Sequence, residues 1–169
     1  RGAADRMAAL LLPDRHISML PSRIADDLAR LRLGEPRPAL SVLWKLSRNL
    51  TLKSAKILPT VVTNCMRFAP ARVDAICEGE AHLLRKALGV LDRLTEQLCT
   101  DRKSAGAGFS IPEYRVETDG ESVRVREVHS DDRAHRIVRE LAVLAAAEIG
   151  TWCAAQGIPT MYEIQDAPE

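Results

Sequence analysis

The sequence predicts a mixed α/β fold in which a largely antiparallel sheet is flanked by long amphipathic helices. Two extended runs lie within residues 38–63, and Asp119-Gly120 separates two further short runs of strand type. Two other segments, 82–102 and 130–156, carry apolar residues at helical spacing. Because hairpin connections dominate this order, most strand pairs should be antiparallel.

The first expected element is a short helix over residues 22–33. Ser22 can serve as its N-cap, and Gly34 follows its last residue. The apolar residues at helical spacing are Ile24, Leu28 and Leu31.

Two strands are expected next. From residue 38 the spacing changes to a period of two, which is typical of a half-buried strand, and a second extended run covers residues 52–63. Since Pro59 cannot donate a ladder hydrogen bond, we expect a sheet edge or a bulge there. The apolar residues of the first alternation are Leu40, Val42, Trp44 and Leu46.

The strongest helical pattern covers residues 82–102. A shorter helix-like stretch from Pro70 to Ile76 precedes it, and Gly79 separates the two. An amphipathic helix buries one apolar stripe. Here that stripe consists of Leu84, Ala87, Leu88, Leu91, Leu94 and Leu98.

A hairpin and a second long helix are expected in the last third of the chain. Residues 114–116 and 123–128 flank Asp119-Gly120, a strong hairpin signal. Ser130 can N-cap a helix that runs to Gln156, where Gly157 ends it. Residues 160–164 should form a final strand.

The composition indicates one compact, soluble domain. The chain has 169 residues with 46% apolar content, enough to bury roughly two-thirds of its unfolded surface. No apolar run approaches the ~20 residues that cross a bilayer, and no cysteine pair has metal-finger spacing. We therefore expect a cytoplasmic protein with reduced thiols and no membrane partner.

Phosphate-loop and metal motifs are absent from the sequence. It contains no G-x-x-x-x-G-K-[ST] and no G-x-G-x-x-G in strand-to-helix context, and its four histidines have no metal-triad spacing. Two acidic pairs, Asp26-Asp27 and Asp131-Asp132, could hold a cation, or could instead lie on a solvated face and at a helix N-terminus.

Several segments in order resemble the RNB catalytic domain of the ribonuclease II and ribonuclease R family. Leu11–Pro21 is similar to its Tyr-Leu-Pro stretch ending in Pro-Met-Leu-Pro. Asp26–Leu28 and Arg37–Val42 are similar to its Leu-x-x-x-Leu-Cys-Ser-Leu and Arg-x-Ala-Leu-Ser pieces. Gly108–Glu113 resembles a phenylalanine followed by Pro-Glu. His135–Ala146 is similar to the Leu-Ile-Glu-Glu helix, and Ile158–Tyr162 to the strand after it.

The resemblance implies a function for a longer parent protein. Members hydrolyse single-stranded RNA from the 3′ end with Mg²⁺ held by clustered aspartates. In the family that aspartate loop precedes the matched segment, and a phosphate-contacting arginine follows it. Residues 1–169 are thus expected to be an internal part of one such domain, with no catalytic or metal-binding residue of its own and with further RNA-binding domains in the parent.

Four residues are implied as RNA-binding positions. Leu11 stands where the family has a base-clamping tyrosine, whereas its partner phenylalanine is retained as Phe109. Arg139 replaces the first glutamate of the helix motif, and Glu140 matches the second. Arg139 could contact a phosphate, pair with an acid or lie exposed, and Phe109 could stack on a base or be an ordinary core ring.

A basic span gives a signal independent of the resemblance. No acidic residue occurs between Glu35 and Asp74, so the interval can offer phosphates a surface of one charge sign. Alternatively, its lysines protect a sheet edge. Its members are Arg37, Lys45, Arg48, Lys53, Lys56, Arg67 and Arg72.

Three functions follow as hypotheses. The parent is a Mg²⁺-dependent 3′-to-5′ exoribonuclease, with this segment lining the RNA channel. Alternatively, it is a catalytically inactive relative that binds RNA, which Leu11 and Arg139 favour. The remaining alternative is an interaction or scaffold domain.

Overall fold

A computed structural model describes residues 8–13, 15–104, 113–118, 121–128 and 132–161. Its strands pair antiparallel as three two-stranded sheets, β1–β2, β3–β4 and β5–β6. The predicted mixed α/β class with antiparallel pairing is confirmed. In chain order the elements are β1 (Leu10–Leu11), β2 (His16–Ile17), the π-helix η1 (Arg23–Leu28), β3 (Pro36–Leu46), β4 (Leu52–Thr63), α2 (Pro70–Glu78), α3 (Arg85–Ser104), β5 (Glu113–Thr118), β6 (Val123–Val128) and α4 (Arg133–Ala155).

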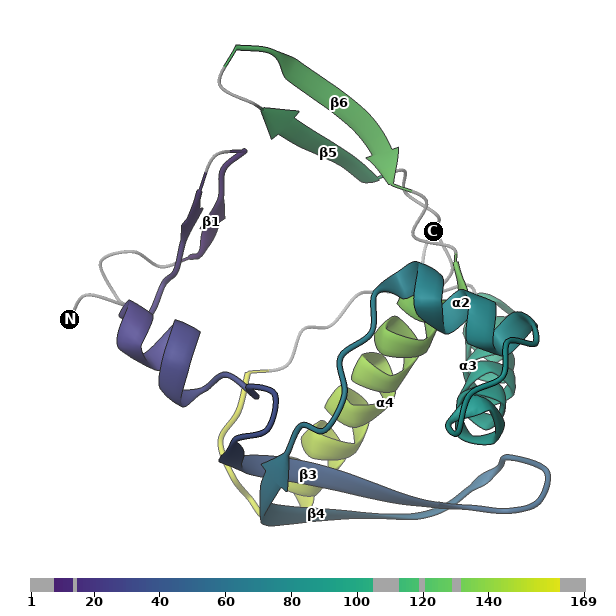
Figure 1. Ribbon diagram of the computed structural model, residues 1–169. Coiled ribbons are helices and arrows are strands. Elements are labelled where there is room, and N and C mark those ends of the chain that lie inside the picture. The colour runs from purple at the N-terminus through teal and green to yellow at the C-terminus, as the bar shows by residue number, and fades with distance from the viewer. Residues whose placement is uncertain (1–7, 14, 105–112, 119–120, 129–131, 162–169) are drawn as a thin grey trace.

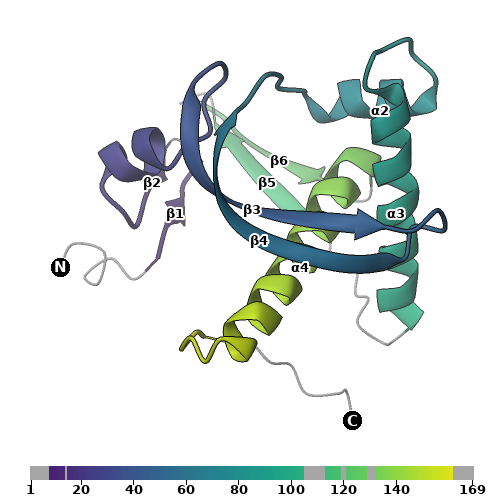
Figure 2. The same cartoon turned by 90° about the horizontal axis from the view of Figure 1, so that it is seen from below.

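The three α-helices pack against one another, and the β3–β4 ribbon crosses α4 (Figures 1 and 2). The element η1 and the small β1–β2 hairpin lie beyond the open end of this ribbon, on the side opposite to its turn. The β5–β6 hairpin extends away from the helices (Figure 1). The helical layer and the ribbon thus form the main body of the molecule.

The β3–β4 ribbon is long and regular. Its register aligns Pro36 with Thr63 and Trp44 with Ala55, and the ladder shifts between Lys45 and Leu46. The bulge is therefore not at Pro59, which pairs with Leu40. Each strand has a single partner in the described part of the chain, so the expected edge position of Pro59 is confirmed.

One apolar residue of the predicted alternation in β3 is not buried. Val42, Trp44 and Leu46 are half-buried, but Leu40 is 60% exposed. Residues two apart share a face of a strand, so Leu40 does lie on the same face. Helix α4 passes β4 nearer the turn, at residues 55–58, and leaves the part of this face around Leu40 uncovered.

The core lies between the three α-helices. Ile76 of α2, Leu94 and Cys99 of α3, and Ile137 of α4 are buried. Thr95 is also buried, and its hydroxyl donates to the carbonyl oxygen of Leu91 at 2.9 Å. The predicted helices over 70–76 and 82–102 are found as α2 and α3, with α2 ending at Gly79, whose φ is 135°. Helix α3 begins only at Arg85, so Leu84 of the predicted stripe precedes it, and Ala87 of that stripe is exposed.

The two predicted N-caps have different outcomes. Ser22 does occupy the N-cap position of η1, but it has helical dihedrals and makes no side-chain capping bond, and the helix expected over residues 22–33 ends at Leu28. In α4 the cap is Asp132, whose carboxylate accepts from the His135 amide at 2.9 Å, while Ser130 lies outside the described residues. An aspartate at this place also favours the positive end of the helix dipole.

The C-terminal segment agrees with the prediction in part. Helix α4 ends at Ala155, and Gly157 has the left-handed φ of 63° that favours glycine after a helix. Thr160 and Met161 are not in a strand, and the remaining part of the predicted strand lies outside the described residues. Among the described helices, none is both long and apolar enough to cross a bilayer.

Candidate functional site

A buried ionic contact joins α3 to α4. The Glu140 side chain is only 2% exposed, and its carboxylate accepts from Arg102 Nη2 at 2.5 Å and from Arg102 Nε at 3.3 Å. The Nε of neighbouring Arg139 lies 3.3 Å from the same carboxylate. Two arginines therefore hold one carboxylate at the helix interface.

The pKa of Glu140 is held below its ordinary value. Burial alone would raise it, but the hydrogen bonds and charges of Arg102 and Arg139 outweigh burial. The hydrogen bond to Glu140 likewise raises the pKa of the Arg102 guanidinium. Glu140 is therefore ionised, and its charge is matched inside the protein.

A second ionic cluster fixes the first turns of α4. Asp92 of α3 accepts from Arg136 at 2.6 Å and lies 3.6 Å from Arg133. Arg133 also reaches Glu78 of α2 at 3.3 Å. The two clusters together set the position of the α4 face that carries Arg139.

One of the alternatives predicted for Arg139 was that it pairs with an acid, and in the structure it pairs with Glu140. Its side chain remains 39% exposed, so the guanidinium lies at the boundary between the interface and solvent. Glu140, by contrast, points into the interface. A direct contact of its carboxylate with RNA would require it to leave Arg102.

The two predicted base-contacting positions are less defined. The backbone of Leu11 belongs to β1, where Leu11 pairs with His16. Phe109 lies outside the described residues. Their roles stay predictions.

The basic span divides into paired and unpaired cations. Arg37 is only 15% exposed and binds Asp27 at 3.1 Å and Glu35 at 2.5 Å, and Arg72 pairs with Glu80. The other members form no ion pair within the described ranges. They are Lys45, Arg48, Lys53, Lys56 and Arg67, all of them exposed.

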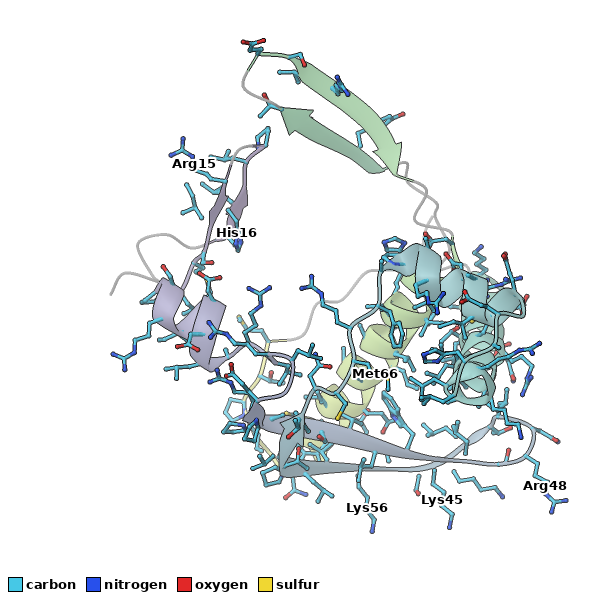
Figure 3. The ribbon with its side chains drawn as sticks, viewed as in Figure 1. Arg15, His16, Lys45, Arg48, Lys56 and Met66 are labelled. Carbon is cyan, nitrogen blue, oxygen red and sulfur yellow. The ribbon has the colours of Figure 1, made fainter. Side chains whose placement is uncertain are left out.

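Three of these cations share one side of the ribbon. Lys45, Arg48 and Lys56 point away from the helices at the turn end of β3–β4 (Figure 3). The register confirms this for the two lysines, because Lys56 pairs with Leu43, two residues before Lys45. We call Lys45, Arg48 and Lys56 the outer basic face.

No described group of three carboxylate, histidine or cysteine side chains could hold a metal ion. Asp27 is engaged by Arg32 and Arg37, and Asp132 caps α4. Asp131 lies outside the described residues. The described donor set does not fit the Mg²⁺ site that the resemblance implies for the parent.

Sequence reasoning missed two residues of the α3–α4 interface. Arg102 and Asp92 bind α4 residues that lie 38 and 44 positions away. In the sequence, each of the two is only a charged residue beside an apolar stripe. That position does not predict which residue of α4 it binds.

The sequence is similar to a known protein family and to individual proteins. The RNB domain profile matches residues 1–169. Ribonuclease R of Chlamydia muridarum is 27% identical over 169 residues, which cover 98% of this chain and 24% of that protein. The exosome complex exonuclease dis3 of Schizosaccharomyces pombe is 28% identical over 148 residues, covering 85% of this chain and 15% of that protein.

Solved structures show the same fold. The apo form of Mycoplasma genitalium RNase R superimposes with a TM-score of 0.79 at 17% identity, over 92% of this chain and 26% of that one. The same enzyme in complex with double-stranded RNA gives 0.81, over 93% and 29%. The chain thus spans about a quarter of the length of the ribonuclease R proteins that it matches.

Proposed function

The chain belongs to the RNB domain family, and from this membership we propose that its parent protein is a 3′-to-5′ exoribonuclease that hydrolyses single-stranded RNA to nucleotide monophosphates. In this proposal residues 1–169 are an internal part of the catalytic domain and line its RNA channel. The match over the whole chain carries the proposal. Relatives named as ribonucleases and a related structure with bound RNA support it.

The proposed activity requires Mg²⁺ held by carboxylates from other parts of the parent. Mg²⁺ prefers oxygen ligands in near-octahedral geometry and, when bound, stabilises the charge that develops on a scissile phosphate. The described residues do not supply such a ligand set. No step of the reaction is therefore assigned to them.

The role proposed for this chain is to bind and orient RNA. Phe109 offers an aromatic ring for stacking on a base. Arg139 offers a guanidinium at the edge of the α3–α4 interface, where Glu140 and Arg102 fix its helix. Leu11 replaces a ring, so it can pack against a nucleotide but cannot stack on it.

The inactive alternative rests on a specific observation. Leu11 and Arg139 differ from the residues that the resemblance implies for holding the terminal nucleotides. A parent with these changes could bind RNA without cutting it. The sequence before residue 1 discriminates, because clustered aspartates there favour the enzyme.

Degradation of a 5′-labelled single-stranded RNA by the full-length parent tests the proposal. We expect mononucleotides and a ladder of labelled fragments shortened from the 3′ end, only when Mg²⁺ is supplied. If the parent binds the RNA without cutting it, the hypothesis of an inactive RNA-binding relative is correct instead. If it neither binds nor cuts the RNA, the hypothesis of an interaction or scaffold domain is left.

The cellular setting forms part of the proposal. We place the parent in the cytoplasm, with RNA as partner and with further RNA-binding domains on the same chain. Fractionation of cells producing a tagged parent checks the compartment.

A further inference from the structure

The outer basic face is a cluster of cations that no acid in the described ranges neutralises. The interval from residue 36 to residue 73 contains no acidic side chain, so the ribbon supplies no counter-charge of its own. Lys56 and Glu148 of α4 both line one groove, but the Lys56 side chain points away from the helices, and the two residues form no ion pair (Figure 3). Cations held together without acids lower the electrostatic potential energy of an incoming anion.

The two cations of the basic span that pair with acids, Arg37 and Arg72, lie away from the outer basic face. Arg37 is drawn to Asp27 and Glu35 at the open end of the ribbon, and Arg72 to Glu80 on the helical side. The outer basic face lies at the turn end and points away from α4 (Figure 3). It is therefore separate from the α3–α4 interface that carries Arg139.

The residue types on this face select the kind of contact. The strand positions that accompany Lys45 and Lys56 are Leu43, Ser54 and Leu58. None is an aromatic ring that could stack on a base. Cations without a stacking ring beside them suit phosphates.

We infer that the outer basic face binds the phosphate backbone of single-stranded RNA as a second contact for long RNA, outside the contact proposed for Arg139 on α4, which we call the α4 site. This inference rests on the proposed function, because it assumes that RNA is the polymer bound. It adds to the proposed function a second RNA-binding surface and a minimum length of RNA that can reach it. An RNA too short to extend beyond the α4 site should not use this face.

Anisotropy measurements with the full-length parent, with Mg²⁺ chelated to prevent cleavage, test the inference. The variant K45Q/K56Q removes two cations. A phosphate contact with a single strand contributes a slope of about 0.7 in log affinity against log salt, or roughly fivefold in affinity at 0.1 M monovalent salt. For a 30-nucleotide RNA we expect about 25-fold weaker binding and a salt slope lower by about 1.4.

The length of the RNA provides an internal control. Affinity for a tetranucleotide should be unchanged in K45Q/K56Q, because it cannot reach both surfaces. The matched variant R23Q/R30Q removes two exposed arginines in and just after η1, beyond the open end of the ribbon, and should leave both affinities unchanged. Circular dichroism verifies that both variants are folded.

The outcomes separate this inference from the proposed function. A parent that degrades RNA while K45Q/K56Q keeps its affinity and salt slope for the 30-mer would overturn the inference alone. Equal losses in K45Q/K56Q and R23Q/R30Q would overturn it too, since net charge would then explain both. A parent that neither binds nor degrades RNA would remove the proposed function and the inference together.

Discussion

Arg102 and Glu140 meet across the α3–α4 interface, and the arginine binds a carboxylate that is almost fully enclosed. Removing one partner of a buried pair leaves the other charged and unsolvated, which costs about 3 to 5 kcal/mol when burial is complete. This pair is less extreme, because Arg102 is 32% exposed and Arg139 still contacts Glu140.

The first prediction is that R102A destabilises the α3–α4 contact by about 2 kcal/mol. Hydrogen exchange of α3 and α4 in the parent measures it as a loss of amide protection. R72A is the matched control, since its partner Glu80 is exposed, and it should cost less than about 1 kcal/mol. Equal effects of the two variants would contradict a special role for the buried carboxylate.

The second prediction concerns acid. Because the pKa of Glu140 in the folded protein lies below its ordinary value of 4.5, its stabilising effect is complete above that pH and is lost as pH falls through the lowered pKa. The stability difference between the wild type and E140Q should therefore be constant from pH 5 to 7 and shrink in stronger acid. Thermal unfolding of both proteins between pH 3 and 7 measures this stability difference. A difference that grows as the pH falls would contradict a lowered pKa of Glu140.

The third prediction separates the true cap of α4 from a residue that only looks like one. D132A should cost about 1 kcal/mol, because the His135 amide loses its acceptor. S22A should leave stability unchanged, since Ser22 makes no capping bond. Amide protection in the first turn of α4, and in η1 for the control, distinguishes them.

The fourth prediction concerns the aromatic position implied by resemblance. F109A in the parent should weaken RNA binding by about 1 to 3 kcal/mol, whereas F109W should retain it, because stacking needs a ring. Affinities measured at one salt concentration check this. If F109A binds RNA as the wild type does, Phe109 is an ordinary core ring.

Elements that depend on local spacing were predictable. The period-two run predicted β3, and the apolar stripe ending at Leu98 predicted α3, because each pattern depends only on near neighbours. The capping bonds were not predictable, because they depend on the folded geometry. Ser22 and Ser130 are good capping residue types, but Ser22 makes no capping bond at the start of η1, and Asp132 caps α4.

The sequence predicted which segments carry the candidate site, but not which side chains contact one another there. The helix motif located Arg139 and Glu140, but nothing local could tell that Glu140 turns inward to a residue 38 positions away. The basic span was visible in the sequence as a run of like charge. Its division depended on Asp27 and Glu80, acids outside the span that reach Arg37 and Arg72 only in the folded chain.

The β3–β4 ribbon has a consequence for self-association. Its strands have no third partner in the part of the chain described, so long rows of backbone donors and acceptors are open to another strand. Pro36, Pro38 and Pro59 remove donors near the open end, and Lys45 and Lys56 place like charges near the turn. Two copies that approach edge to edge would meet missing donors at one end and repulsion at the other, which disfavours fibre-like stacking of the ribbon.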